Sequence, residues 1–318
     1  MTFRCEDAVD DYVSKCLQLA LLLEVSAYPK PGNVHRIANF SDTRYEHFLA
    51  SSVALFPHFR LAAKRGVQFS KGELSLDEVE IGKVIKDSVE DMIRWQRGGN
   101  TLLGAVILLS PIAVASGITF SQRRTSLKKL RENVHKVVVS TTPKDAVNVY
   151  DAIKKANPSG LGNVSELDIN DPDSKRRILK ERISLYQIFQ IAAPYDAVCS
   201  EWVNNYPITF DVAHPLFMEQ LEKVHDLNTA IVHTYLKVLA KHPDTFIARK
   251  TGIPKAHEAS SMAKEVLELG GLETLEGRKR LHEFDLELRK SGNLLNPGTT
   301  ADIVAAALAL SVLGGYRP

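Results

Sequence analysis

Apolar residues recur at helical spacing along most of the chain, and glycines and prolines punctuate them. We found no sustained alternation of Val, Ile or Thr, so few strands or none are expected. The pattern predicts an all-α protein, with residues 1–318 forming a single domain around a few buried apolar helices. The predicted helices cover residues 12–23, 42–65, 75–95, 102–118, 126–139, 142–156, 178–191, 197–204, 216–239, 256–269, 275–290 and 299–313.

The most apolar segment is residues 102–118. Gly104, Ser110, Pro111 and Ser116 interrupt it, and it falls short of the roughly 20 apolar residues that a membrane span needs. We therefore expect a buried core helix and no membrane association. Residues 299–313 are almost wholly apolar beyond Asp302 and predict a second buried helix.

The composition is that of an ordinary globular protein, with 44% hydrophobic and 25% charged residues. The 40 basic and 38 acidic residues leave a net charge of +2, so nothing in the overall charge favours nucleic acid as a partner. Three scattered cysteines and a polar N-terminus with no signal-peptide pattern predict reduced thiols in a cytoplasmic protein. The sequence leaves open whether the chain forms an oligomer.

The first helix is broken at residues 26–36 by two prolines and a glycine. Proline cannot continue a helix, so the helix should end near Ala27. The stiff loop that follows would present Lys30, Asn33, His35 and Arg36 to an anion such as a phosphate chain. The alternative is a connector with solvated basic residues. In either case a loop lysine is expected to add little to folding stability.

Glu24 lies just before this loop, near the end of an apolar helix. A buried carboxylate needs a cation, a metal or a proton. Glu24 is thus a candidate functional residue, and a salt bridge to Lys30 or Arg36 is an equally good interpretation.

Three more breaks occur at residues 98–101, 242–245 and 296–302. The first and the last open strongly apolar helices, whose N-termini offer unpaired N–H groups and a positive dipole end to anions. Asn100 or Thr101 could cap one of these helices.

Together these breaks resemble the triphosphoribosyl-dephospho-CoA synthase family, and the chain is interpreted as a divergent member. The matching residues keep the family's order over nearly the whole chain: Glu24-Val25 with Pro29-Lys30-Pro31-Gly32, Asn100-Thr101 with Gly104, Asp244-Thr245, and Asn296-Pro297-Gly298 with Ala301-Asp302. Three positions depart from it. Leu102-Leu103 replaces a basic pair, His35 replaces an acidic residue, and Ala248-Arg249-Lys250 stands where a His-Arg pair is usual.

The resemblance implies a transferase that displaces adenine from ATP and places the triphosphoribosyl group on a dephospho-CoA-like acceptor. It implies catalytic carboxylates at Glu24, Asp244 and Asp302, and expected Mg²⁺ held by Asp302 and Glu24. The substrate-binding residues would be Lys30, Gly32, Asn33, His35, Asn100, Thr101, Arg249, Asn296, Gly298, Thr299 and Thr300.

Plainer interpretations stay open for two of the carboxylates. Asp302 could stand near the start of its helix simply because the helix dipole stabilises a negative charge there, and Asp244 could belong to an ordinary turn. A nucleotide N-ribosyl hydrolase and a non-catalytic nucleotide- or CoA-binding helical protein are the alternative functions.

Overall fold

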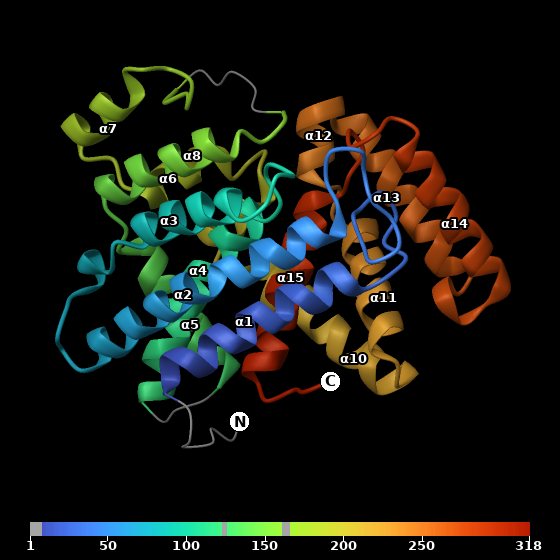
Figure 1. The fold of residues 1–318 in the computed structure, drawn as a ribbon, viewed down its shortest axis with the longest axis horizontal. Helices are drawn as coiled ribbons and strands as arrows, with labels where there is room; N and C mark the ends of the chain where they lie inside the picture. Colours follow the sequence, from blue (N-terminus) through green and yellow to red (C-terminus); the bar gives the residue numbers. More distant parts are fainter. Residues whose placement is uncertain (1–7, 123–125, 161–165) are drawn as a thin grey trace.

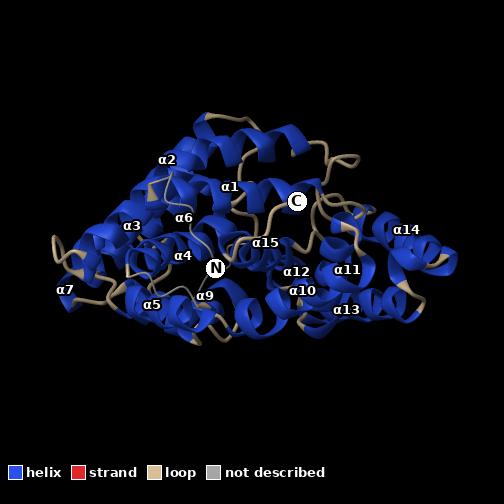
Figure 2. Cartoon of the chain, turned by 90° about the horizontal axis from the view of Figure 1, so that it is seen from below, coloured by secondary structure: helices blue, strands red, loops and turns tan. Residues whose placement is uncertain are grey.

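The computed structural model describes residues 8–122, 126–160 and 166–318. Within these ranges the chain is helical and has no strand, apart from one isolated bridge between His35 and Ala38 (Figure 2). The all-α prediction is therefore confirmed. The elements are α1 (Val9–Ser26), α2 (Tyr45–Ser70), η1 (Leu76–Val79), α3 (Ile81–Arg94), α4 (Leu103–Ser121), α5 (Leu127–Val139), α6 (Pro143–Ala156), α7 (Ser174–Glu181), α8 (Leu185–Ala192), α9 (Ala197–Val203), η2 (Ile208–Ala213), α10 (His214–Val224), α11 (Leu227–Lys241), α12 (Thr245–Thr251), α13 (Ile253–Glu268), η3 (Gly271–Glu273), α14 (Leu275–Arg289) and α15 (Gly298–Leu313).

Helices α1, α2, α4 and α15 form the centre of the molecule (Figure 1). Both α4 and α15 are buried on almost every face, because nearly all of their side chains are apolar. By length and composition α4 could cross a membrane, but 94% of its most apolar window is buried inside the protein. It is the core helix that the sequence predicts.

The remaining helices extend to two sides of this centre. Helices α3, α6 and α7 lie at one end of the long axis, and α13 and α14 lie at the other (Figures 1 and 2). The buried apolar residues nevertheless form one continuous cluster that runs from Val13 to Leu313. This continuity supports the single-domain organisation, which stays a prediction.

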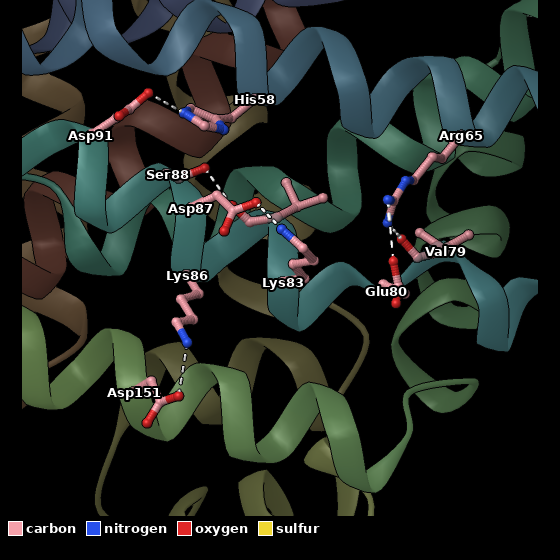
Figure 3. Close-up of polar contacts among 11 residues, drawn as sticks. His58, Arg65, Val79, Glu80, Lys83, Lys86, Asp87, Ser88, Asp91 and Asp151 are labelled. Carbon is pink, nitrogen blue, oxygen red and sulfur yellow. Dashed lines mark hydrogen bonds and ion pairs between the residues drawn. The ribbon is translucent and has the colours of Figure 1, made fainter.

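Polar contacts join α3 to its neighbours on either side (Figure 3). His58 of α2 contacts Asp91 of α3 at 2.7 Å, and Lys86 of α3 contacts Asp151 of α6 at 2.9 Å. Arg65 of α2 donates to the carbonyl oxygen of Val79 in the short connection before α3. These contacts fix the helical layer on one side of the cavity described below.

Several helix limits differ from those predicted. The helix predicted over residues 75–95 is interrupted at Glu80, that over 178–191 at Arg182, and that over 216–239 at His225. Each of these residues adopts a left-handed backbone conformation, with φ of 49°, 56° and 49°. Glycine usually marks such a position, and no glycine stands here, so the sequence carried no signal for the break.

Other helix ends agree more closely with the pattern. Helix α1 ends at Ser26 and Ala27 is already extended, as the following prolines require. At the start of α4 the cap position is Leu102 rather than Asn100 or Thr101, although the Asn100 side chain accepts a hydrogen bond from the Leu103 N–H group at 3.1 Å.

Candidate active site

A cavity of about 630 Å³ lies where the breaks in the central helices come together. Its walls include the end of α1, the starts of α4 and α15, and parts of α6, α8, α9 and α12. Nine of the predicted site residues line it: Glu24, Asn33, Asn100, Thr101, Arg249, Asn296, Gly298, Thr299 and Asp302. They come from four segments that are far apart in sequence.

Asp302 lies one turn into α15, against the first turn of α4. A Cβ atom on Gly104 would fall 2.0 Å from Oδ2 of Asp302, so the carboxyl group occupies space that only a glycine leaves open. Burial raises the pKa of Asp302 well above its usual range, and the negative charges of Glu24 and Asp244 raise it further. In these surroundings Asp302 favours a proton or a neighbouring cation. Because it lies beyond the first turn of α15, the helix dipole alone does not account for it.

Glu24 and Lys30 form a buried ion pair beside Asp302. Lys30 is fully buried, its Nζ donates to Oε1 of Glu24, and only Glu24 lines the cavity. Burial raises the pKa of Glu24 and lowers that of Lys30, and each partner's charge opposes the other's shift. The prediction that Lys30 is an accessible loop cation for phosphate is therefore wrong. The salt bridge that the sequence left as an alternative is the one that forms.

Hydrogen bonds to α11 and α14 fix the loop around Lys30. The Tyr235 hydroxyl of α11 donates to the Pro31 carbonyl at 3.0 Å, and the Gly32 N–H group donates to Asp285 of α14 at 2.8 Å. Gly32 has φ of 68°, and a Cβ atom there would lie 2.7 Å from Leu288. Gly32 thus serves the turn and does not line the cavity.

Asp244 is also buried and does not line the cavity. Its Oδ1 accepts hydrogen bonds from the N–H groups of Phe246 and Ile247, and its Oδ2 accepts from the N–H and hydroxyl groups of Thr300. One carboxylate therefore caps α12 and ties it to the start of α15. The structure places Asp244 and Thr300 in a supporting role behind the cavity, in place of the predicted direct contact with substrate.

His35 is likewise outside the cavity lining, with 1% of its surface exposed. Neither ring nitrogen has a hydrogen-bond partner among the described residues. Burial lowers the pKa of His35 to about 3, and the nearby charges of Lys30, Arg289 and Arg36 lower it in the same direction. His35 is a neutral buried histidine and cannot act as the cationic phosphate contact that the sequence predicted.

Sequence reasoning missed the ion pair between Arg249 and Asp196, both of which line the cavity. Asp196 also caps α9 by accepting from the Cys199 N–H group at 3.0 Å. Arg249 and Lys250 both approach the ring of Phe246, and the Nζ of Lys250 lies 3.7 Å from its centroid. This cluster places positive charge near the start of α15.

Residues 10–318 match the family model of ATP:dephospho-CoA triphosphoribosyl transferase. The chain belongs to this family. The resemblance inferred from the helix breaks is thus confirmed.

Two curated relatives of this transferase family illustrate the likeness. A protein of Pseudomonas fluorescens strain Pf0-1 is 25% identical, covering 92% of this chain and 88% of the relative, and one of Streptococcus equi subsp. equi is 24% identical, covering 96% and 97%. Both are assigned as 2-(5''-triphosphoribosyl)-3'-dephosphocoenzyme-A synthases. A crystal structure from Archaeoglobus fulgidus, assigned as a triphosphoribosyl-dephospho-CoA synthase, has the same fold, with a TM-score of 0.63, 22% identity, and coverage of 85% of this chain and 100% of that one.

The cavity has apolar side chains at the start of α4, where the resemblance predicted basic ones. Leu102 and Leu103, which stand where the resemblance predicted a basic pair, are 5% and 8% exposed, and both line the cavity. The start of α4 therefore presents apolar side chains next to Asn100 and Thr101. Of the cationic residues predicted for the site, Arg249 is the one that lines the cavity.

The described residues contain no group of three or more His, Cys, Asp or Glu side chains placed to hold a metal ion on their own. Magnesium in nucleotide sites is usually bound by one or two carboxylates together with phosphate oxygens. Asp302 fits that donor set, because it is buried, lines the cavity and forms no ion pair with a basic side chain of the described residues. Glu24 fits it less well, since its charge is already matched by Lys30.

Proposed function

We propose that this protein transfers the triphosphoribosyl group of ATP to a hydroxyl group of a dephospho-CoA-like acceptor, with adenine as the leaving group. The observation that carries the proposal is the meeting of the family's motif residues at one cavity. Glu24, Asn100, Asn296 and Asp302 are dispersed along the sequence and all line it, together with Arg249.

The reaction breaks the bond between ribose C1′ and adenine and forms a bond from C1′ to the acceptor oxygen. Positive charge develops on the ribose as the base departs, so a nearby carboxylate stabilises the transition state. Glu24 suits this task because Lys30 favours its ionised form. The acceptor hydroxyl must also lose its proton. Asp302 is the candidate proton acceptor, because its carboxyl group lines the cavity and burial with the charges of Glu24 and Asp244 raises its pKa.

The triphosphate would meet Arg249 and the start of α15, where Gly298 and Thr299 line the cavity. The N–H groups of a helix N-terminus and a guanidinium group both stabilise phosphate charge. Bound Mg²⁺ would be held by Asp302 with the phosphate oxygens and would neutralise part of their charge. Asn100 and Thr101 would supply further polar side chains in the same cavity.

The test is an assay for free adenine. Protein, ATP and Mg²⁺ are incubated with and without dephospho-CoA, and adenine is measured by chromatography. Adenine that appears only when the acceptor is present supports the transferase. Equal release without the acceptor would establish a nucleotide hydrolase instead, and tight binding with no release would establish a binding protein.

We further infer a cytoplasmic location. Cys16 and Cys199 are reduced thiols in the described part of the chain, which suits a reducing compartment. Localisation of a tagged full-length chain by fractionation tests this.

A further inference from the structure

The cavity has a second, apolar part that the proposed chemistry does not use. Its wall consists of side chains from α4, α6, α8 and α9, here called the apolar wall: Ile107, Val149, Ile153, Ile188, Phe189 and Val198. Five of the six are at most 9% exposed, and Ile153 is partly buried. All six nevertheless face the same cavity as Asp302.

The apolar wall offers very little to a charged ligand. Apart from Lys155 at the exposed end of α6, the residues of α6, α8 and α9 that line the cavity are uncharged. The Tyr150 hydroxyl already donates to the Leu167 carbonyl at 2.5 Å. Burial raises the pKa of the Cys199 thiol to about 12, which keeps it neutral. A phosphate chain would lose its hydration here without gaining partners.

The apolar wall is also firmly supported. The Trp202 indole N–H of α9 donates to the Ile107 carbonyl at 3.1 Å, and Tyr206 donates to the Leu108 carbonyl at 3.0 Å. The rings of Phe189 and Trp202 meet edge to face with their centroids 4.9 Å apart. Helices α8 and α9 are thereby fixed against α4, and a preformed apolar surface binds a ligand at a smaller entropic cost than a flexible one.

The two proposed substrates, ATP and dephospho-CoA, differ in the part of the molecule that could contact the apolar wall. Both ATP and dephospho-CoA contain an adenosine 5′-phosphate, so the adenosine moiety cannot distinguish them. ATP continues as a charged triphosphate, whereas the acceptor continues into a long neutral arm of alkyl, amide and thiol groups. Only the neutral arm gains free energy from an apolar surface.

We propose that the apolar wall binds the neutral pantetheine-type arm of the acceptor and is the element by which the protein distinguishes acceptor from donor. This inference rests on the proposed function for the identity of the acceptor. It assigns the two parts of the cavity to two tasks: reaction and phosphate binding at Asp302 and Arg249, and acceptor selection at α6, α8 and α9.

The experiment compares the binding of three ligands by calorimetry without turnover: dephospho-CoA, 5′-AMP, which lacks the arm, and ATP. Ile153→Asp places a carboxylate on the apolar wall. The affinity for dephospho-CoA should fall roughly tenfold or more, since the arm would meet an unpaired charge, while the affinities for 5′-AMP and ATP stay within about twofold. Asn148→Asp adds the same charge to α6 outside the cavity lining and should change none of the three affinities.

Val198→Thr is a second, nearly isosteric variant for the case in which Ile153→Asp does not fold. It should weaken dephospho-CoA binding selectively, in the same direction and by less. An equal loss for all three ligands would overturn the proposal and place the adenine base on the wall. Unchanged dephospho-CoA binding, or wild-type protein that binds it no more tightly than 5′-AMP, would overturn it as well. Adenine release by wild-type protein tests the proposed function separately, so the two can fail independently.

Discussion

At the residue scale, the Glu24–Lys30 pair changes the interpretation of the motif that contains it. Lysine between two prolines suggested a preorganised phosphate contact, but the side chain points inward and its charge is used by Glu24. Lys30 is then a positioning residue, which acts on the cavity through the carboxylate that lines it. Its loss should affect folding, contrary to what its loop position indicated.

We predict that Lys30→Met lowers the free energy of unfolding by roughly 3–5 kcal/mol, because Glu24 is left as an unpaired buried charge. Urea unfolding followed by circular dichroism measures this. The double variant Glu24→Gln, Lys30→Met should recover a large part of the loss. A single variant with an unchanged urea midpoint would show that the pair does not stabilise the fold.

His35 predicts a dependence of stability on pH. Its pKa is about 3 in the folded protein against 6.5 for the free side chain. The unfolded chain therefore takes up the proton first as the pH falls, and His35 removes stability between about pH 6.5 and pH 3, with no effect above that window. The slope from this one group approaches about 1.4 kcal/mol per pH unit.

In His35→Gln, we expect the loss of stability on acidification to be shallower by that amount. Chemical unfolding at a series of pH values gives the slope for each protein. His135→Gln, at an exposed position of α5, is the matched control and should retain the wild-type slope. Equal slopes in all three proteins would contradict the assignment of a neutral buried ring.

At the element scale, glycines set how closely the central helices approach. A Cβ atom on Gly66 of α2 would lie 2.0 Å from the Val114 carbonyl oxygen, and one on Gly117 of α4 would lie 2.1 Å from that of Ala63. The two helices thus pack backbone to backbone at this crossing. Gly104, at the other end of α4, leaves space for a side chain instead, the carboxyl group of Asp302.

Two substitutions in the same helix should therefore have different effects. Gly117→Ala must push α2 away and should cost about 1–3 kcal/mol of stability. Gly104→Ala meets only the movable end of Asp302, so stability should change less, while displacement of the carboxyl group should reduce adenine release by roughly a hundredfold. Thermal unfolding and the adenine assay distinguish the two. If Gly104→Ala lost activity only in proportion to the fraction of protein that is unfolded, this prediction would be contradicted.

At the scale of the whole molecule, the cavity exists because separate helix ends meet. Helix α1 ends where α4, α12 and α15 begin, and Asp244 ties the starts of α12 and α15 together. Carboxylates from two of these ends, Glu24 and Asp302, thereby come close enough for the charge of Glu24 to raise the pKa of Asp302. Neither could do the proposed chemistry in its own segment alone.

We predict that Asp302→Asn reduces adenine release in the presence of acceptor by roughly 10²–10⁴-fold, as loss of a general base does. If the carboxylate also holds Mg²⁺, part of the loss should be recovered at high Mg²⁺ concentration. A magnesium titration of both proteins separates these roles. Asp87→Asn removes a partly exposed carboxylate of α3 that lies outside the cavity lining; it is the control and should keep wild-type activity. An active Asp302→Asn variant would remove Asp302 from the mechanism.

The sequence by itself determined the helical class, most helix limits, the positions of the breaks that meet at the cavity and the family. These depend on local pattern, since apolar spacing fixes the buried faces and proline fixes where a helix ends. The sequence did not predict the interruptions at Glu80, Arg182 and His225, because a residue other than glycine that adopts the left-handed conformation has no local sequence signature.

Only the tertiary structure decided which residues of each break face the cavity. Lys30 and Glu24 share one motif, yet one is covered and the other lines the cavity. Asp244 and Asp302 both lie near the start of a helix and burial raises the pKa of both, but the Asp244 carboxylate accepts four hydrogen bonds behind the cavity, whereas Asp302 lines the cavity. Burial and the charges of distant segments set these roles, and both arise only when the helices pack together.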